Sequence, residues 1–297
     1  MTVDVYTPLV LSLLLAAISP AVGRRVAPAL AARVLTAAAV VTAAAGVWSL
    51  VLLAATLVND APPVVAEARE NGRRLVEPVP EGIGVLACLA LAVVAHRLWR
   101  AVRTTLGTRR ALRRLCEGHP PGTELIVAAS EVPRAFAIPG PPGRILVTSA
   151  MLGALQPVER RVLLAHERAH LAHRHSLLVT AANLAVAANP LLGPVRATVA
   201  FLVERWADER AAATVGDRTT TARALARAAL SAGRPGPSCA LGFTDRAITR
   251  RVAALQCAPP PHLRSVAAAV LALGVLPALG AADATDDLLH LLTNVLV

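Results

Sequence analysis

The sequence predicts a mainly α-helical integral membrane protein with four transmembrane helices and one cytoplasmic α+β domain. Hydrophobic residues make up 55% of the 297 residues and charged residues only 16%. The mean hydropathy of +0.57 is too high for an ordinary soluble domain. Long stretches lack Asp, Glu and Arg, and residues 100–264 between them carry both strand and helix patterns.

Four uncharged stretches mark the expected spans, since a bilayer core needs about 20 residues of helix. We place transmembrane helices at residues 5–23, 34–58, 82–99 and 265–282. The third stretch is short and must extend toward Trp99, with His96 and Arg97 reaching the interface. Because the segment before the first span contains Asp4 and no Arg, we expect a retained anchor rather than a secretory signal.

The arginines orient these spans, because basic residues are enriched on the cytoplasmic side of membrane helices. Residues 24–33 hold three Arg and no acid, residues 97–114 hold seven Arg, and the acids gather in 60–81 and 283–297. We therefore expect the N-terminus outside, the domain 100–264 in the cytoplasm, and the tail 283–297 outside. Arg to the exclusion of Lys, with abundant Ala, indicates a GC-rich bacterial genome and hence a bacterial cell membrane.

A fifth uncharged stretch, residues 176–195, complicates this topology. If it crossed the bilayer, the Arg-rich segment 196–264 would be exported, against the charge rule. We interpret it as a buried or membrane-skimming helix that closes near Asn189 and Pro190. A re-entrant helical hairpin is the main alternative.

The net charge of +11 does not indicate a nucleic-acid-binding protein. Most arginines flank the expected spans, where anionic lipid attracts them. Aromatic residues make up only 2% of the chain, so base-stacking platforms are missing. We expect contact with the lipid bilayer and no direct binding of nucleic acid.

Two regions between residues 124 and 149 have strand character. Residues 124–128 form one, and residues 134–149 contain two short apolar runs separated by Pro139-Gly140-Pro141-Pro142-Gly143. Two strands joined by a turn are the natural interpretation of the second region.

The most informative motif is His166-Glu167-Arg168-Ala169-His170. Residues four apart project from one face of a helix, so both imidazoles can reach one ion while Glu167 reaches a water on it. The flanks predict a helix, because Pro157 suits its first turn and the run 158–175 has no Gly or Pro. A metal-dependent hydrolase is the leading hypothesis.

A third ligand is needed, because a catalytic zinc takes three ligands from the protein and leaves one position to water. Glu204 is our candidate, and Asp208, one turn later, could accept the free ring N–H of a zinc histidine. The alternative is that Glu204 is a solvated charge paired with Arg205 or Arg210.

Other residues have less certain roles in the predicted site. His173, His175 and Arg210 are candidates to stabilise an oxyanion, since the single tyrosine, Tyr6, lies at the outer end of the first span. For His173 we prefer the interpretation as a polar residue behind the site or at an interface. The strand Ala135, Phe136, Ala137 and Ile138 is our candidate to hold an extended substrate by β-addition, with a plain core hairpin as the alternative.

These motifs together resemble the BlaR/MecR-type membrane zinc peptidases. The resemblance covers roughly residues 97–282, and the zinc motifs are its specific part. The HtpX and CAAX-prenyl-protease type has similar zinc motifs but usually places membrane helices differently, and it is the alternative.

The resemblance implies a zincin-like α+β metallopeptidase domain of the gluzincin class. His166, His170 and Glu204 would hold one Zn²⁺ per chain, Glu167 would be the base, and Asp208 would support a ligand. It also implies a protein substrate, which in antibiotic-sensing members is a BlaI/MecI-like transcriptional repressor. Only residues 283–297 follow the fourth predicted span, so we expect neither a penicillin-binding sensor domain nor beta-lactam sensing.

Three classes of function therefore remain. The first is an active membrane peptidase, in which Glu167 takes a proton from water and delivers it to the leaving amine. The second is a catalytically silent, zinc-stabilised transducer. The third is a basic membrane scaffold with an accidental motif.

Overall fold

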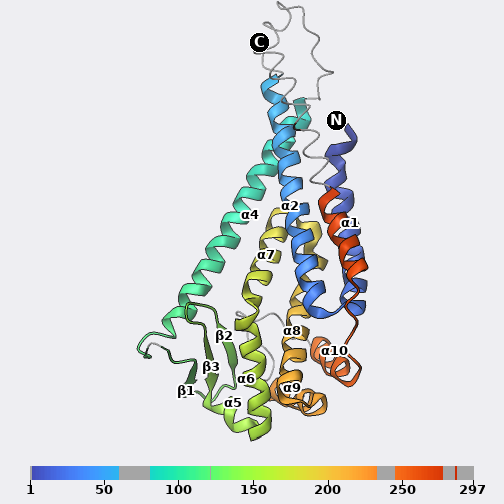
Figure 1. The fold of residues 1–297 in the computed structure, drawn as a ribbon. Helices are drawn as coiled ribbons and strands as arrows, with labels where there is room; N and C mark the ends of the chain where they lie inside the picture. Colours follow the sequence, from blue (N-terminus) through green and yellow to red (C-terminus); the bar gives the residue numbers. More distant parts are fainter. Residues whose placement is uncertain (1, 60–80, 121, 233–244, 277–284, 286–297) are drawn as a thin grey trace, which may run out of the picture.

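The computed structural model describes residues 2–59, 81–120, 122–232, 245–276 and 285. Long helices form one end of the molecule, and a small sheet with shorter helices forms the other (Figure 1). The elements are α1 (Thr2–Arg25), α2 (Pro28–Asn59), α4 (Glu81–Arg114), β1 (Leu125–Ala128), β2 (Ala135–Ile138), β3 (Arg144–Thr148), α5 (Ser149–Ala154), α6 (Pro157–Ala172), α7 (His175–Ala188), the 3₁₀ helix η1 (Pro190–Leu192), α8 (Gly193–Val215), α9 (Arg218–Ala232) and α10 (Asp245–Gln256). A further apolar helix, Arg264–Leu276, follows α10.

Among the described residues, three helices have the length and composition of membrane spans. Their apolar parts are Thr7–Arg25, Pro28–Ala55 and Gly82–Arg114. These helices correspond to the three spans expected at 5–23, 34–58 and 82–99. The third helix does not end at residue 99 but continues as one element to Arg114, so it reaches into the segment assigned to the cytoplasmic domain.

The prediction of four spans is met only in part. Within the described residues the last apolar helix, Arg264–Leu276, is shorter than a span, and residues 277–282 of the expected fourth span lie outside them. This helix nevertheless packs closely on α2. A Cβ at Gly274 would lie 2.7 Å from Cα of Ala38, so the contact requires a glycine.

The stretch 176–195 forms a helix that closes at Asn189 and Pro190, as expected, and this helix is the first arm of a helical hairpin, the alternative to a skimming helix. Helix α7 ends at Ala188, η1 makes the turn, and α8 returns beside α1 and α2 (Figure 1). Asn189 holds the turn, because its Oδ1 accepts from Leu191 N–H and its Nδ2 donates to Ser12 Oγ at 2.7 Å. A hairpin keeps both arms on one side of the bundle, so Glu204 returns to the level of the sheet.

Large hydrophobic side chains are exposed in a band that we call the apolar belt. Its members are Leu9, Val10, Leu13 and Leu14 on α1, Val40 and Val51 on α2, Ile83, Val85, Leu86, Leu89 and Val93 on α4, and Leu271, Val275 and Leu276 on the last helix. Soluble monomers rarely expose so much apolar surface, and a lipid environment accounts for it. Below the belt, α8 covers α1 and α2, and α7 covers α2 and α4. Leu35, Val199 and Leu202 are fully buried there.

The sheet has the strand order β1-β3-β2. β1 pairs with β3 in parallel, and β2 pairs with β3 antiparallel with Phe136 opposite Leu146. The expected strands at 124–128 and in 134–149 are therefore present, and β2 has the bounds of the predicted substrate strand. Since β2 has a partner on one side only among the described strands, it is an edge.

Candidate metal centre

Helix α6 carries the His-Glu-x-x-His motif, and its start is fixed locally. Pro157 occupies the first turn, and Gln156 and Glu159 form a reciprocal capping box. The buried Glu159 also accepts from Arg227 Nη1 of α9 at 2.8 Å, so the helix is anchored at that end as well. The motif therefore lies on a rigid helix, as the sequence predicts.

Helix α8 packs against α6 and brings Glu204 to the two histidines. The Nε2 atoms of His166 and His170 are 3.1 Å apart. Glu204 Oε2 lies 3.5 Å from His166 Nε2, and Glu204 Oε1 lies 3.6 Å from His170 Nε2. All three residues are largely buried, so three donor groups converge on one point from two helices.

The outer nitrogen of each histidine also has a partner. His166 Nδ1 is 3.1 Å from Asp208 Oδ1, as expected for the carboxylate one turn after Glu204. His170 Nδ1 is 3.0 Å from Nδ1 of His175, which is 1% exposed. Such partners fix the ring orientation and direct both Nε2 atoms to the common point.

Arg251 completes the cluster and was not found from the sequence. It comes from α10, is 2% exposed, and binds Asp208 with two hydrogen bonds of 2.7 and 2.6 Å. Its Nη1 also lies 3.1 Å from Glu204 Oε2. One guanidinium thus orients both carboxylates, through the planar fork that only arginine offers.

Burial and charge perturb the histidines in opposite directions. Burial alone would lower the pKa of His166, but its bonds with Asp208 and Glu204 raise that pKa to about 10. Burial lowers the pKa of His170 to about 4, which keeps its ring neutral. The carboxylates therefore favour positive charge beside His166, and the neutral ring of His170 offers a lone pair.

Both carboxylates remain ionised despite their burial. Burial would raise the pKa of Glu204, but the hydrogen bond with His166 and the charge of Arg251 hold it well below the usual range. The pKa of Asp208 is lowered in the same way, against burial, chiefly by Arg251. The cluster thus keeps anionic oxygens at a buried point, which suits a divalent cation.

Glu167 lies beside the cluster rather than in it. The side chain is buried, and that burial raises its pKa to about 7 against the opposing charge of His166. A backbone hydrogen bond from Ala137 of β2 lowers the pKa and shows that the strand edge is adjacent. The candidate base therefore faces the edge strand.

The backbone of β2 has an open side at this point. Thr148 N–H donates to Arg134 O, so alternate residues from Arg134 onward direct their backbone groups to β3. Ala135 and Ala137 then direct theirs to the open side, where Ala137 meets Glu167. This edge could pair with an added strand.

The three candidate oxyanion residues occupy different places. His175 is engaged with His170, and His173 stacks on Trp206 with ring centroids 4.6 Å apart. Arg210 is exposed on α8. Trp206 also contacts a membrane helix: the guanidinium of Arg33 on α2 lies over its ring, 4.6 Å from the ring centroid.

Comparison with known proteins gives one match. The sequence model described as peptidase family M48 matches residues 108–264, which include every residue of the cluster. No curated protein and no solved structure matches the chain. The match supports a metallopeptidase at the level of the family. It does not distinguish the BlaR/MecR type from other members of that family.

Proposed function

The chain belongs to peptidase family M48, and from this we propose that it is a membrane-embedded zinc endopeptidase whose metal is held by His166, His170 and Glu204. The metallopeptidase class follows from the family. The choice of zinc, the ligand set and the roles below are our proposal.

The spacing of the donor atoms carries this proposal. Around a tetrahedral zinc with bonds of about 2.0–2.2 Å, ligand atoms are about 3.3–3.6 Å apart. The three separations here are 3.1, 3.5 and 3.6 Å. Two imidazoles and one carboxylate are also the ligand set of hydrolytic zinc sites, which favours zinc over calcium or magnesium.

The protonation of the histidines fits the same assignment. If His170 Nε2 gives its lone pair to the metal, its proton is on Nδ1, which then donates to His175 Nδ1. His175 can accept there, because burial lowers its pKa to about 3 and the ring is neutral. We therefore assign His175 to positioning His170 and leave the oxyanion role to His173 or Arg210.

The chemistry uses the residues around this point. When bound, zinc acts as a Lewis acid that polarises the peptide carbonyl and acidifies a water. Glu167 takes the proton of that water and passes it to the leaving amine, for which a pKa near neutrality is well suited. The open edge of β2 binds the substrate backbone through Ala135 and Ala137, which holds the scissile bond beside Glu167.

The substrate we propose is an extended segment of a cytoplasmic or membrane-adjacent protein. Any extended chain can pair with a strand edge, so the cluster itself does not select a sequence. Cleavage of a BlaI/MecI-like repressor is supported only by the resemblance of the motifs. Membrane quality control or protein processing is the alternative for an HtpX or CAAX-protease type.

Metal removal tests the proposal as a whole. The purified chain should contain one zinc per molecule, and a chelator should abolish cleavage of an unfolded test protein that stoichiometric zinc then restores. Stoichiometric zinc without any cleavage would exclude the peptidase and support the silent transducer. A chain that binds no stoichiometric zinc would exclude both and support the scaffold.

The orientation in the membrane is a separate proposal with its own test. From the arginines of α4, of the last turn of α1 and of the first turns of α2 we infer that the sheet and the cluster lie in the cytoplasm and that the last helix leads outward. Reporter fusions at Gly122 and Ala282 should therefore report inside and outside, respectively. The reverse pattern would contradict this topology.

Arg251 should act as a positioning residue for the metal site. Arg251→Lys keeps the charge but loses the bidentate contact with Asp208, and we expect zinc affinity to fall by about 10–100-fold. Arg250→Lys is the matched control, since Arg250 lies over the ring of Phe201 instead. Competition with a zinc chelator measures both, and equal affinities in the two variants would contradict the assignment.

A further inference from the structure

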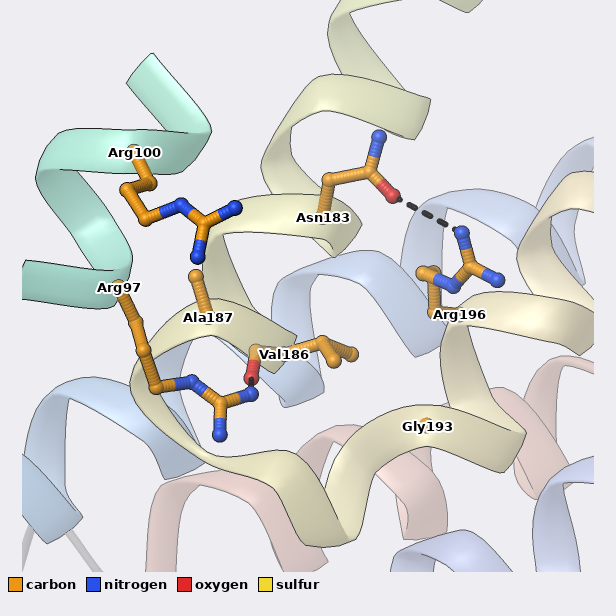
Figure 2. Close-up of a pocket in the computed structure, with 7 residues that line it drawn as sticks. All are labelled: Arg97, Arg100, Asn183, Val186, Ala187, Gly193 and Arg196. Atoms are coloured by element: carbon orange, nitrogen blue, oxygen red, sulfur yellow. Dashed lines mark hydrogen bonds between the residues drawn. The ribbon is translucent and has the colours of Figure 1, made fainter. Parts of the chain in front are cut away.

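An open pocket of about 650 Å³ lies between α4 and the α7–α8 hairpin. Three arginines line it, Arg97 and Arg100 from α4 and Arg196 from α8, and no Asp or Glu does. Figure 2 shows Arg97 and Arg100 on one side of Val186 and Ala187 of α7, and Arg196 on the other side, with its guanidinium turned to Asn183. Arg196 precedes Glu204 by eight residues, or about 12 Å along α8, so the pocket is separate from the metal cluster.

Within the described residues, no carboxylate neutralises the positive charge of this pocket. Among the described ion pairs none involves Arg97, Arg100 or Arg196. Arg97 Nη2 donates to Val186 O at 3.2 Å and Arg196 Nη1 donates to Asn183 Oδ1 at 3.4 Å. Since a guanidinium has five N–H donors, most of the donors around the pocket remain available to an anion. Three arginines that line one pocket, with no acidic residue among its lining, suit a phosphate.

The pocket lies at the edge of the apolar belt. On α4 the belt as defined above ends at Val93 and Arg97 follows one turn later, and beyond it Trp99, Val102 and Leu106 are the exposed large hydrophobic residues of this helix. On the hairpin the tip residue Leu191 is exposed, and Asn189 is bonded to Ser12, which lies among the belt residues of α1. A lipid whose chains cover the belt would thus have its phosphate at the level of the arginines.

The neighbouring surface of α4 has the features of a membrane interface. Trp99 is 56% exposed, and the guanidinium of Arg103 lies 5.2 Å from its ring centroid. Exposed tryptophan beside arginine is typical of the headgroup level. From these observations we propose that the pocket binds the phosphate of an anionic phospholipid. This site requires neither the metal nor peptidase activity.

Binding can be measured as a rise in unfolding temperature of the full chain in a neutral detergent. Phosphatidylglycerol should raise that temperature with a saturable dose dependence, whereas phosphatidylcholine and inorganic phosphate at the same concentrations should not. An equal effect of phosphatidylcholine would overturn the proposal. If inorganic phosphate raised the unfolding temperature as much as phosphatidylglycerol, the pocket would be a site for a free anion. If an acidic peptide raised it as much, the pocket would be a site for a protein partner. Either result would refute the lipid site.

Matched variants locate the effect. Arg100→Gln with Arg196→Gln removes two pocket charges, and at about a fivefold loss per arginine the affinity for phosphatidylglycerol should fall about 30-fold. Arg110→Gln with Arg113→Gln removes the same charge from exposed positions of α4 and should leave affinity unchanged. Arg97 is kept in both, since its bond to Val186 holds α4 on α7. Equal losses in the two double variants would overturn the site.

Discussion

Replacing Glu167 by Gln should lower peptidase activity by about 10²–10⁴-fold, the contribution typical of a positioned general base. The amide has nearly the shape of the carboxylate but cannot take a proton from water. Zinc content should be unchanged, because the donor atoms that converge belong to His166, His170 and Glu204. Cleavage of an unfolded test protein and zinc content, measured on the same preparation, check both parts.

The control for this change is Glu117→Gln, which makes the same substitution at an exposed position. It should retain full activity and full zinc content. The Glu167→Gln chain should also retain its unfolding temperature or gain slightly, since a buried carboxylate is replaced by a neutral group. Undiminished cleavage by Glu167→Gln would rule out the proposed base, whatever the metal content.

The parts of the site that follow local rules could be predicted from the sequence. The spacing of His166 and His170 specifies one helix face, and Pro157 specifies where that helix begins. The strand Ala135–Ile138 has the predicted bounds because a Pro- and Gly-rich turn follows it directly. Each inference needed only a few neighbouring residues.

Arg251 shows what such rules miss. Arg250 and Arg251 are neighbours in an Arg-rich segment, yet one lies over Phe201 and the other is buried against Asp208, 43 positions earlier. Only the packing of α10 against α8 separates them. No spacing pattern connects residues that meet through tertiary structure.

The hairpin could be named only as an alternative for a related reason. Residues 176–195 have the composition of a buried, skimming, spanning or re-entrant helix alike. The choice depends on the contact between Asn189 and Ser12, which are 177 positions apart, and on the covering of α1 and α2 by both arms. His175 is similar, since its role depends on which nitrogen of His170 it meets.

Replacing Glu204 by Ala should lower zinc affinity by more than the roughly 10–100-fold typical of losing a residue that supports a ligand. The change removes one of the three donors and leaves two imidazoles, whose Nε2 atoms are 3.1 Å apart, without an anion opposite them. It also takes one of two carboxylate partners from the buried Arg251, although Asp208 remains. We therefore expect a chain that folds with reduced stability and is purified without stoichiometric zinc.

Loss of metal must be separated from loss of fold, and Glu209→Ala provides the comparison. Glu209 lies one turn further along α8 and pairs with Arg205 and Arg218, so its removal also breaks ion pairs on the same helix. Those partners do not touch the cluster, and zinc content should be unchanged. If Glu204→Ala retained one zinc per chain at the affinity of Glu209→Ala, another residue would be the third ligand. If both lost zinc alike, the effect would come from α8 as a whole, because the carboxylate at 204 would then have no special part in binding.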